Sequence, residues 1–300
     1  MNQPPRGPSG LPLAITAYTI WGFLPLYIAL LRAVPPVELV SWRVVFTLPF
    51  CLTIALFRGQ LGEIAKALAT LRVLRLLFAS ALLIGCNWVL YIYAVNRGHV
   101  FAASLGYYIN PLLNVLLGTV FLGERLNRTQ WLAVALAAAG VAVLAAGARD
   151  TLWISLGLGL SFALYGLVRK LTPVGSLPGL TVETVVLLPL AVAAAAWFAA
   201  GPAEAAFGHE LRTSLLLAGA GVLTAVPLLC FALAARRMDL STLGFVQFLS
   251  PTIAFVLGLL VFGETLRQVQ LASFVLIWAA IAVFSWDLLR RHGASAKPPA

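Results

Sequence analysis

The chain has 300 residues, of which 61% are hydrophobic and only 10% are charged. Soluble globular domains carry about a quarter charged residues, so this composition, with a mean hydropathy of +0.98, excludes that class. The net charge of +10 would suit a nucleic-acid partner, but the basic residues are distributed as in a membrane protein. We therefore expect an all-α integral membrane protein that lies in the lipid bilayer and has no nucleic-acid partner.

Apolar runs long enough to cross a bilayer recur along the whole chain. A span needs roughly 20 mainly apolar residues at a rise of about 1.5 Å per residue. The sequence predicts ten such helices, at residues 11–31, 37–57, 72–95, 100–122, 130–147, 151–169, 180–200, 212–234, 240–262 and 268–288. The terminal segments 1–10 and 293–300, rich in Pro, Gly and Ala, are expected to be disordered.

The Lys and Arg residues divide unequally between the two sides of the expected membrane. If the N-terminus is cytoplasmic, fourteen of the twenty fall in cytoplasmic segments, among them Arg169 and Lys170, and five fall outside. The remaining one, Arg43, lies within a helix. Because cytoplasmic loops carry the excess of positive charge, both termini are predicted to be cytoplasmic.

A few polar and aromatic side chains stand out in the first three expected helices. Arg43 lies about six residues into the second helix, where an intramembrane charge is a functional candidate, although one shallow enough to snorkel. Asn87 and Tyr91 of the third helix are four residues apart and share a face. An amide and a phenol at mid-membrane favour a polar cavity over contact with lipid. Trp21 of the first helix suits either a gate or packing.

The fourth helix contains "SLGYYINPL", with Tyr107, Tyr108, Asn110 and Pro111 near its middle. Proline removes a backbone hydrogen bond and bends a helix, and the freed carbonyl must find another partner in lipid. We expect these side chains to line a cavity. Tyr107 and Tyr108 point about 100° apart, and Tyr107 is favoured because Asn110 and Pro111 follow it at i+3 and i+4.

A second segment, "GFVQFLSPTIAFVLGLLVFGETL", resembles the fourth helix when the chain is shifted along itself without gaps. This repeat shift aligns Pro111 with Pro251, Gly118 with Gly258, and Gly123-Glu124 with Gly263-Glu264. It divides the chain into a first five-helix unit, 1–147, and a second, 148–292. Five is an odd number, so the second unit enters the membrane from the opposite face. Inverted repeats of this kind are typical of transporters with a binding site near the midplane.

The second unit supplies counterparts for the candidates in the first. Tyr165 occupies the "YG" slot that corresponds to "WG" at Trp21. Glu183 lies about three residues into the seventh helix, and the repeat shift aligns it with Arg43. The two charges should therefore lie at corresponding depths from opposite faces, each able to snorkel, and should not pair. Gln247 and Ser250 of the ninth helix should complete the cavity, with Pro251 bending that helix.

The sequence shows no catalytic or metal-binding pattern. Asp150, Asp239 and Asp287 are isolated near helix ends, and the three cysteines have no metal-site spacing. We expect no enzyme activity, no metal and no cofactor. A channel remains the rival of a carrier, because an inverted repeat can also enclose a continuous pore.

Four segments carry a resemblance to a known family: "AYTIWGFLPLY", "NWVLYIYAVNRGHVFAASLGYYINPLLNVLLGTVFLGERL", "SFALYGLVRK" and "GLTVETVVLLPLA". They resemble the RarD-type branch of the EamA transporters, in the drug/metabolite transporter superfamily, over residues 13–288. The resemblance implies ten helices in two five-helix repeats, a bacterial inner-membrane location and transport of small metabolites, including amino acids and aromatic compounds. That branch usually has an acidic residue two positions before the Ser of "SLGY", where this chain has Ala102.

Together these features predict a secondary carrier that works by alternating access and exports small metabolites, most plausibly amino acids including aromatic ones. Other amphipathic metabolites or drugs, or a channel-like facilitator, are the alternatives. The apparent lack of a fixed central charge suits a zwitterionic substrate. No protein partner is implied.

Overall fold

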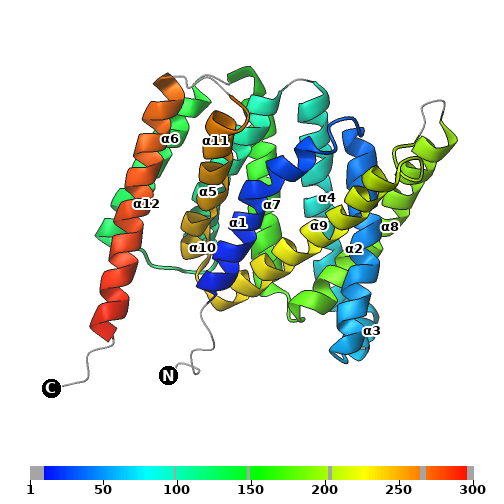
Figure 1. The fold of residues 1–300 in the computed structure, drawn as a ribbon. Helices are drawn as coiled ribbons and strands as arrows, with labels where there is room; N and C mark the ends of the chain where they lie inside the picture. Colours follow the sequence, from blue (N-terminus) through cyan, green and yellow to red (C-terminus); the bar gives the residue numbers. More distant parts are fainter. Residues whose placement is uncertain (1–9, 98, 147–148, 202–204, 264–267, 296–300) are drawn as a thin grey trace.

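The computed structural model describes residues 10–97, 99–146, 149–201, 205–263 and 268–295, and this part of the chain is helical without strands (Figure 1). Its helices are α1 (Leu11–Ala29), α2 (Pro36–Phe57), α3 (Leu61–Ala69), α4 (Leu71–Asn96), α5 (Val100–Phe121), α6 (Arg128–Ala145), the short 3-10 helix η1 (Arg149–Thr151), α7 (Leu152–Leu171), α8 (Ser176–Ala200), α9 (Leu211–Arg237), α10 (Leu240–Gln247), α11 (Leu249–Leu260) and α12 (Gln268–Ser295).

The predicted membrane-spanning character is confirmed. Within the described residues, nine segments are long and apolar enough to cross a bilayer, and α10 with α11 counts as one of them. The remaining expected span is α5, a helix of 22 residues that is not among the nine. The number of ten spans therefore stays a prediction.

The expected ninth helix, 240–262, is not continuous, because it breaks at Phe248 between α10 and α11. The cause lies three residues later at Pro251, which has no N–H for the carbonyl of Gln247 and whose ring crowds that carbonyl. Pro111 is accommodated inside an uninterrupted α5. The same residue type therefore leaves one helix uninterrupted and interrupts its counterpart.

Other boundaries also differ from those expected. The short amphipathic α3, with Ile64 and Ala67 buried, lies in a stretch for which no helix was predicted. Helix α8 begins at Ser176, four residues earlier than expected. Helix α12 extends to Ser295, so 293–295 are not disordered, because each added residue extends an existing helix by one hydrogen bond. Glu264 and the segments 1–9 and 296–300 lie outside the described residues.

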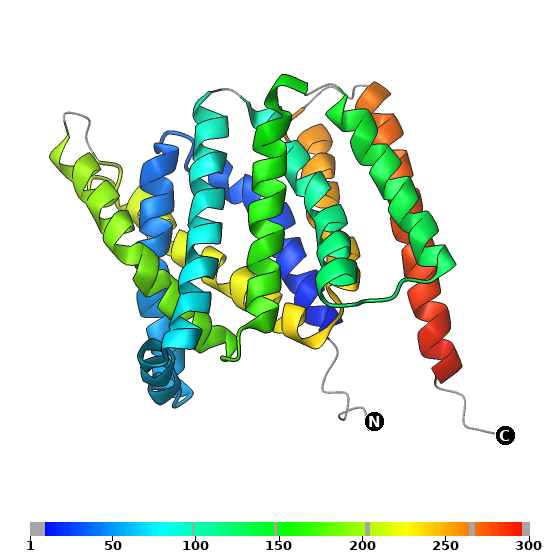
Figure 2. The same ribbon diagram turned by 180° about the vertical axis from the view of Figure 1, so that it is seen from behind.

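The chain crosses the bundle alternately up and down, and α1 begins on the same face where α12 ends, at the bottom of Figure 1. Seen from behind, the connections α5–α6 and α7–α8 also lie on this lower face (Figure 2). Helix α1 packs against α9 and α11, while its counterpart α7 packs against α4 and α5. Helices α6 and α12 pair at one side of the bundle.

The helix ends repeat as well. Gly123 after α5 and Gly263 after α11 both have φ of +66°, a left-handed conformation that glycine adopts without steric cost. These are glycines that the repeat shift aligns. The exchanged packing partners and matched helix ends are what an inverted repeat would produce.

Candidate functional site

A narrow pocket lies where α2, α4, α7, α8 and α9 meet. Eight of its eleven lining residues form four pairs that the repeat shift aligns: Val44 and Thr184, Thr47 and Leu187, Ile84 and Thr224, Trp88 and Leu228. The other three are Tyr165, Leu180 and Glu183. Equivalent positions from both halves thus surround one pocket, as expected for a pocket on the axis that relates the halves. The two side chains of each pair differ in chemistry, so the two halves contribute different chemical groups to the pocket.

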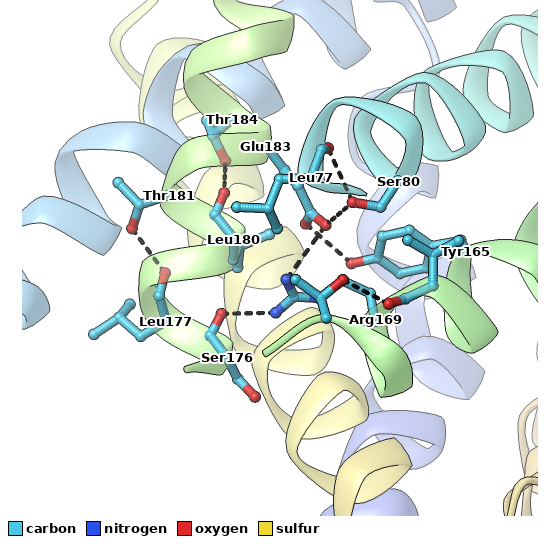
Figure 3. Close-up of polar contacts among 12 residues, drawn as sticks. Leu77, Ser80, Tyr165, Arg169, Ser176, Leu177, Leu180, Thr181, Glu183 and Thr184 are labelled. Atoms are coloured by element: carbon cyan, nitrogen blue, oxygen red, sulfur yellow. Dashed lines mark hydrogen bonds and ion pairs between the residues drawn. The ribbon is translucent and has the colours of Figure 1, made fainter. Parts of the chain in front are cut away.

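The lower end of the pocket contains a buried ion pair (Figure 3). Glu183 is the eighth residue of α8, and its Oε1 lies 3.5 Å from Nη1 of Arg169 on α7. The exposed fractions of these side chains are 2% and 1%. The expectation that Glu183 snorkels near a membrane face is wrong, because α8 begins earlier and its carboxylate finds a cation inside the bundle. Arg169, counted above in a cytoplasmic segment, is likewise buried within α7.

Further polar contacts hold this pair in place (Figure 3). The hydroxyl of Ser80 on α4 donates to Oε1 of Glu183, and the hydroxyl of Tyr165 donates to Oε2 at 3.3 Å. Nη2 of Arg169 donates to the carbonyl of Ser176 at 3.0 Å. A Cβ at Gly179 would lie 2.1 Å from Nη1 of Arg169, so only glycine leaves room for this guanidinium. Helices α4, α7 and α8 therefore meet at one charged cluster.

A different arrangement surrounds Arg43, the eighth residue of α2, which lies beside the pocket and contacts its lining residues Thr224 and Trp88. Its Nε donates to the hydroxyl of Thr224 on α9 at 2.8 Å, and its Cζ lies 5.5 Å from the centre of the Trp88 ring. The phenols of Tyr91 and Tyr107 lie within electrostatic range of the guanidinium, with their ring centres 6.5 Å apart. The exposed fraction of Tyr107 is 41%, whereas that of Glu183 is 2%.

Arg43 has no acidic partner within the described residues, where the ion pair formed is that of Arg169 with Glu183. The expectation that Arg43 and Glu183 do not pair agrees with this geometry. Charged side chains from α2, α7 and α8 nevertheless lie inside the bundle, those of Arg169 and Glu183 as a pair.

The amides expected to line a cavity form hydrogen bonds with neighbouring helices. Nδ2 of Asn110 donates to the carbonyl of Gly159 at 3.1 Å, which ties α5 to α7. Nδ2 of Asn114 donates to Oδ1 of Asn110 at 3.1 Å and to Oε1 of Gln247 at 2.8 Å, which ties α5 to α10. The hydroxyl of Tyr18 also donates to Gln247, at 3.5 Å. All these side chains are buried.

Asn87 makes a similar contact between α4 and α7. Its Nδ2 donates to the carbonyl of Leu158 at 2.8 Å and to the hydroxyl of Ser161 at 2.9 Å. Although Asn87 and Tyr91 are on the same helix, their contacts differ, since Tyr91 lies near Tyr107 and Arg43.

The remaining candidates lie elsewhere in the bundle. The hydroxyl of Tyr108 donates to the carbonyl of Pro251 at 3.3 Å, and its ring packs edge-on against Phe274 of α12. Tyr108 thus contacts other neighbours than Tyr107 does. Trp21 and Tyr165 belong to an aromatic cluster with Tyr18, Phe162 and Phe231. Ser250 is half-buried at the start of α11.

Two of the residues that build these contacts were not among the sequence candidates, although signals existed for both. Asn114 follows Asn110 at i+4, and Arg169 follows Tyr165 at i+4, so each shares a helix face with a candidate.

Within the described residues, no three His, Cys, Asp or Glu side chains gather into a group that could hold a metal.

Known proteins resemble this chain over most of its length. The EamA-like transporter family matches residues 8–146. An uncharacterised transporter of Pseudomonas aeruginosa is 46% identical over 281 residues, covering 94% of either chain. Protein RarD of Salmonella typhimurium is 44% identical over 280 residues, covering 93% of this chain and 95% of that protein. A crystal structure with 19% sequence identity shares the fold, with a TM-score of 0.72 over 94% of this chain and 98% of its own.

The fold and these relatives define a class, a bacterial multi-pass membrane transporter. Within that class, the chain belongs to the EamA-like transporter family, in its RarD-type branch, so the resemblance read from the sequence is confirmed.

Proposed function

We propose that this transporter is a secondary carrier of the bacterial inner membrane that exports small metabolites, chiefly amino acids including aromatic ones. The observation that carries the proposal is the pocket lined by equivalent positions of the two halves, with Glu183 in its lining and Arg43 beside its lining residues Thr224 and Trp88. Membrane carriers built from inverted repeats bind their substrates near the midplane, where the halves meet.

Alternating access fits the difference between the two ends. At the lower end, Glu183 and Arg169 are buried and join α4, α7 and α8. At the upper end, Tyr107 is accessible beside Arg43. In this proposal the structure represents the state closed on the lower face, and rocking of the halves would open the Arg169–Glu183 cluster while covering Arg43.

The candidate residues take two roles in this proposal. Tyr91 and Tyr107 would contact the substrate, since aromatic faces suit aromatic or aliphatic side chains. Asn87, Asn110 and Gln247 would hold the helices at the angles that shape the pocket, since their amide groups contact neighbouring helices. Trp21 and Tyr165 would form an aromatic wall between them.

The orientation follows from charge. The lower face carries the beginning of α1, the end of α12 and the connections rich in Lys and Arg, so we place it in the cytoplasm. The carrier needs no enzyme activity, cofactor or protein partner in this proposal, and its free energy comes from the substrate gradient or an ion gradient.

Counterflow in proteoliposomes tests the proposal. The purified protein is reconstituted, the vesicles are loaded with unlabelled phenylalanine, leucine or no substrate, and entry of labelled phenylalanine is followed. A carrier gives saturable entry that internal substrate accelerates, whereas protein-free vesicles give neither. Entry that rises linearly and ignores internal substrate would indicate a channel. Exchange of larger amphipathic compounds without any exchange of amino acids would leave the carrier mechanism intact and replace the substrate.

A further inference from the structure

Arg43 is an intramembrane cation that has no counter-ion among the described residues. A guanidinium has five N–H donors, and in the described part of the chain only Nε of Arg43 has an acceptor, the hydroxyl of Thr224. Charged side chains inside membrane spans normally pair or mark a substrate pathway, because an isolated charge is costly there. Glu183, at the counterpart position, follows this pattern because it forms an ion pair with Arg169.

The surroundings of Arg43 favour one class of ligand. Trp88 presents its ring to the guanidinium, and the phenols of Tyr91 and Tyr107 lie nearby. One guanidinium can bind a carboxylate with two parallel hydrogen bonds. A phosphate dianion would call for further cations, and within the described residues no second cation accompanies Arg43 in this cluster. Aromatic walls around a single positive charge suit a small aromatic monoanion.

We propose that Arg43 binds the carboxylate of the transported substrate, with Trp88, Tyr91 and Tyr107 enclosing its aromatic part. The inference rests on the proposed carrier function, because it takes the ligand to be the transported molecule. An occupied site would be electrically compensated, as the Arg169–Glu183 cluster already is, and could then be enclosed at lower cost. Substrate binding would thereby favour closure of the upper end.

Binding to the purified full-length protein tests the proposal with three probes: 3-phenylpropionate, which has only the carboxylate, phenethylamine, which has only the amine, and phenylalanine, which has both. The wild type should bind the two carboxylates and discriminate against the amine. Arg43→Gln should weaken carboxylate binding by about tenfold or more. Arg43→Lys should weaken it by less, since an ammonium keeps the positive charge but cannot donate two parallel hydrogen bonds to a carboxylate. Arg32→Gln, at an exposed arginine that follows α1, is the matched control and should bind as the wild type does.

Each outcome bears on the assignment. Unchanged 3-phenylpropionate binding in Arg43→Gln, equal binding of phenethylamine, or no carboxylate binding by the folded wild type would overturn it. Thermal melting verifies that the variants fold, and Arg43→Lys replaces Arg43→Gln if the latter does not. Counterflow separates the two proposals. Arg43-dependent binding without exchange would refute the carrier function and support the binding site. Exchange restricted to cationic compounds would support the carrier function and refute the binding site.

Discussion

The guanidinium of Arg169 on α7 and the carboxylate of Glu183 on α8 lie 3.5 Å apart, in an interior where neither side chain exceeds 2% exposure. Ser80 and Tyr165 donate to the same carboxylate, so three helices converge on one charge pair. Glu183 also lines the pocket that the two halves share, whereas Arg43, its counterpart in the first half, has no acidic partner among the described residues. Several measurable consequences depend on this difference.

Removing one member of the pair should destabilise the protein strongly. Glu183→Gln or Arg169→Met leaves an uncompensated buried charge, which in other proteins costs about 3–5 kcal/mol. The double variant removes both charges and should lie nearer to the wild type than the sum of the single losses. Thermal melting of the four proteins in detergent measures the coupling, and additive losses would mean that the pair contributes nothing.

A methyl group at Gly179 should displace Arg169. The added Cβ of Gly179→Ala would lie 2.1 Å from Nη1, so the guanidinium must leave its position beside Glu183. Overpacking of this kind costs about 1–3 kcal/mol. Gly62→Ala in α3, where an added Cβ meets nothing within 4 Å, is the matched control. Equal melting temperatures for both variants would contradict the close contact.

Substitutions at the candidate residues should separate into two classes at matched membrane expression. Tyr107→Ala should reduce export with little loss of stability, because the ring is accessible. Asn110→Ala and Gln247→Ala should lower the melting temperature first, since hydrogen bonds between membrane helices contribute on the order of 0.6–2 kcal/mol each. Near-normal export in all three variants would show that Tyr107 does not bind the substrate and that the two amides are not needed to shape the site.

Transport should depend little on a proton gradient through Glu183. Protonation of this carboxylate would leave Arg169 buried without its counter-charge. Ala102, where the resemblance led us to expect an acid, cannot carry a proton at that position. Counterflow and pH-driven uptake are compared for wild type and Glu183→Gln. Loss of the pH-driven component alone, with exchange intact, would show that Glu183 does carry the proton.

Both termini should be cytoplasmic. Reporter fusions at Ala300, one active only in the cytoplasm and one active only outside it, give opposite readings for the two orientations. The unequal distribution of Lys and Arg predicts activity of the cytoplasmic reporter. The reverse result would invert the membrane orientation of the whole bundle and place Arg43 on the cytoplasmic side of the pocket.

The sequence by itself determined the class of the protein and much of its layout. Apolar runs of the length of a bilayer predict membrane helices from local composition, with no knowledge of their neighbours. The repeat shift likewise aligned Gly123 with Gly263, and the structure gives both the same backbone conformation. Both properties follow from the order of residues along the chain, so the sequence suffices to predict them.

Only the tertiary structure decided which polar groups meet. Asn110 and Gln247 were expected at a cavity, yet a third amide, Asn114, joins them across α5 and α10. Arg169 was counted with the cytoplasmic segments, at the end of the expected helix 151–169, because the sequence marks the end of an apolar run and not the depth of a side chain. The burial of Arg169 depends on the carboxylate of Glu183 and on the lack of a side chain at Gly179, and both residues belong to the next helix. Hydrogen bonds and ion pairs between helices depend on their relative rotation and height, which follow from the packing of the whole bundle.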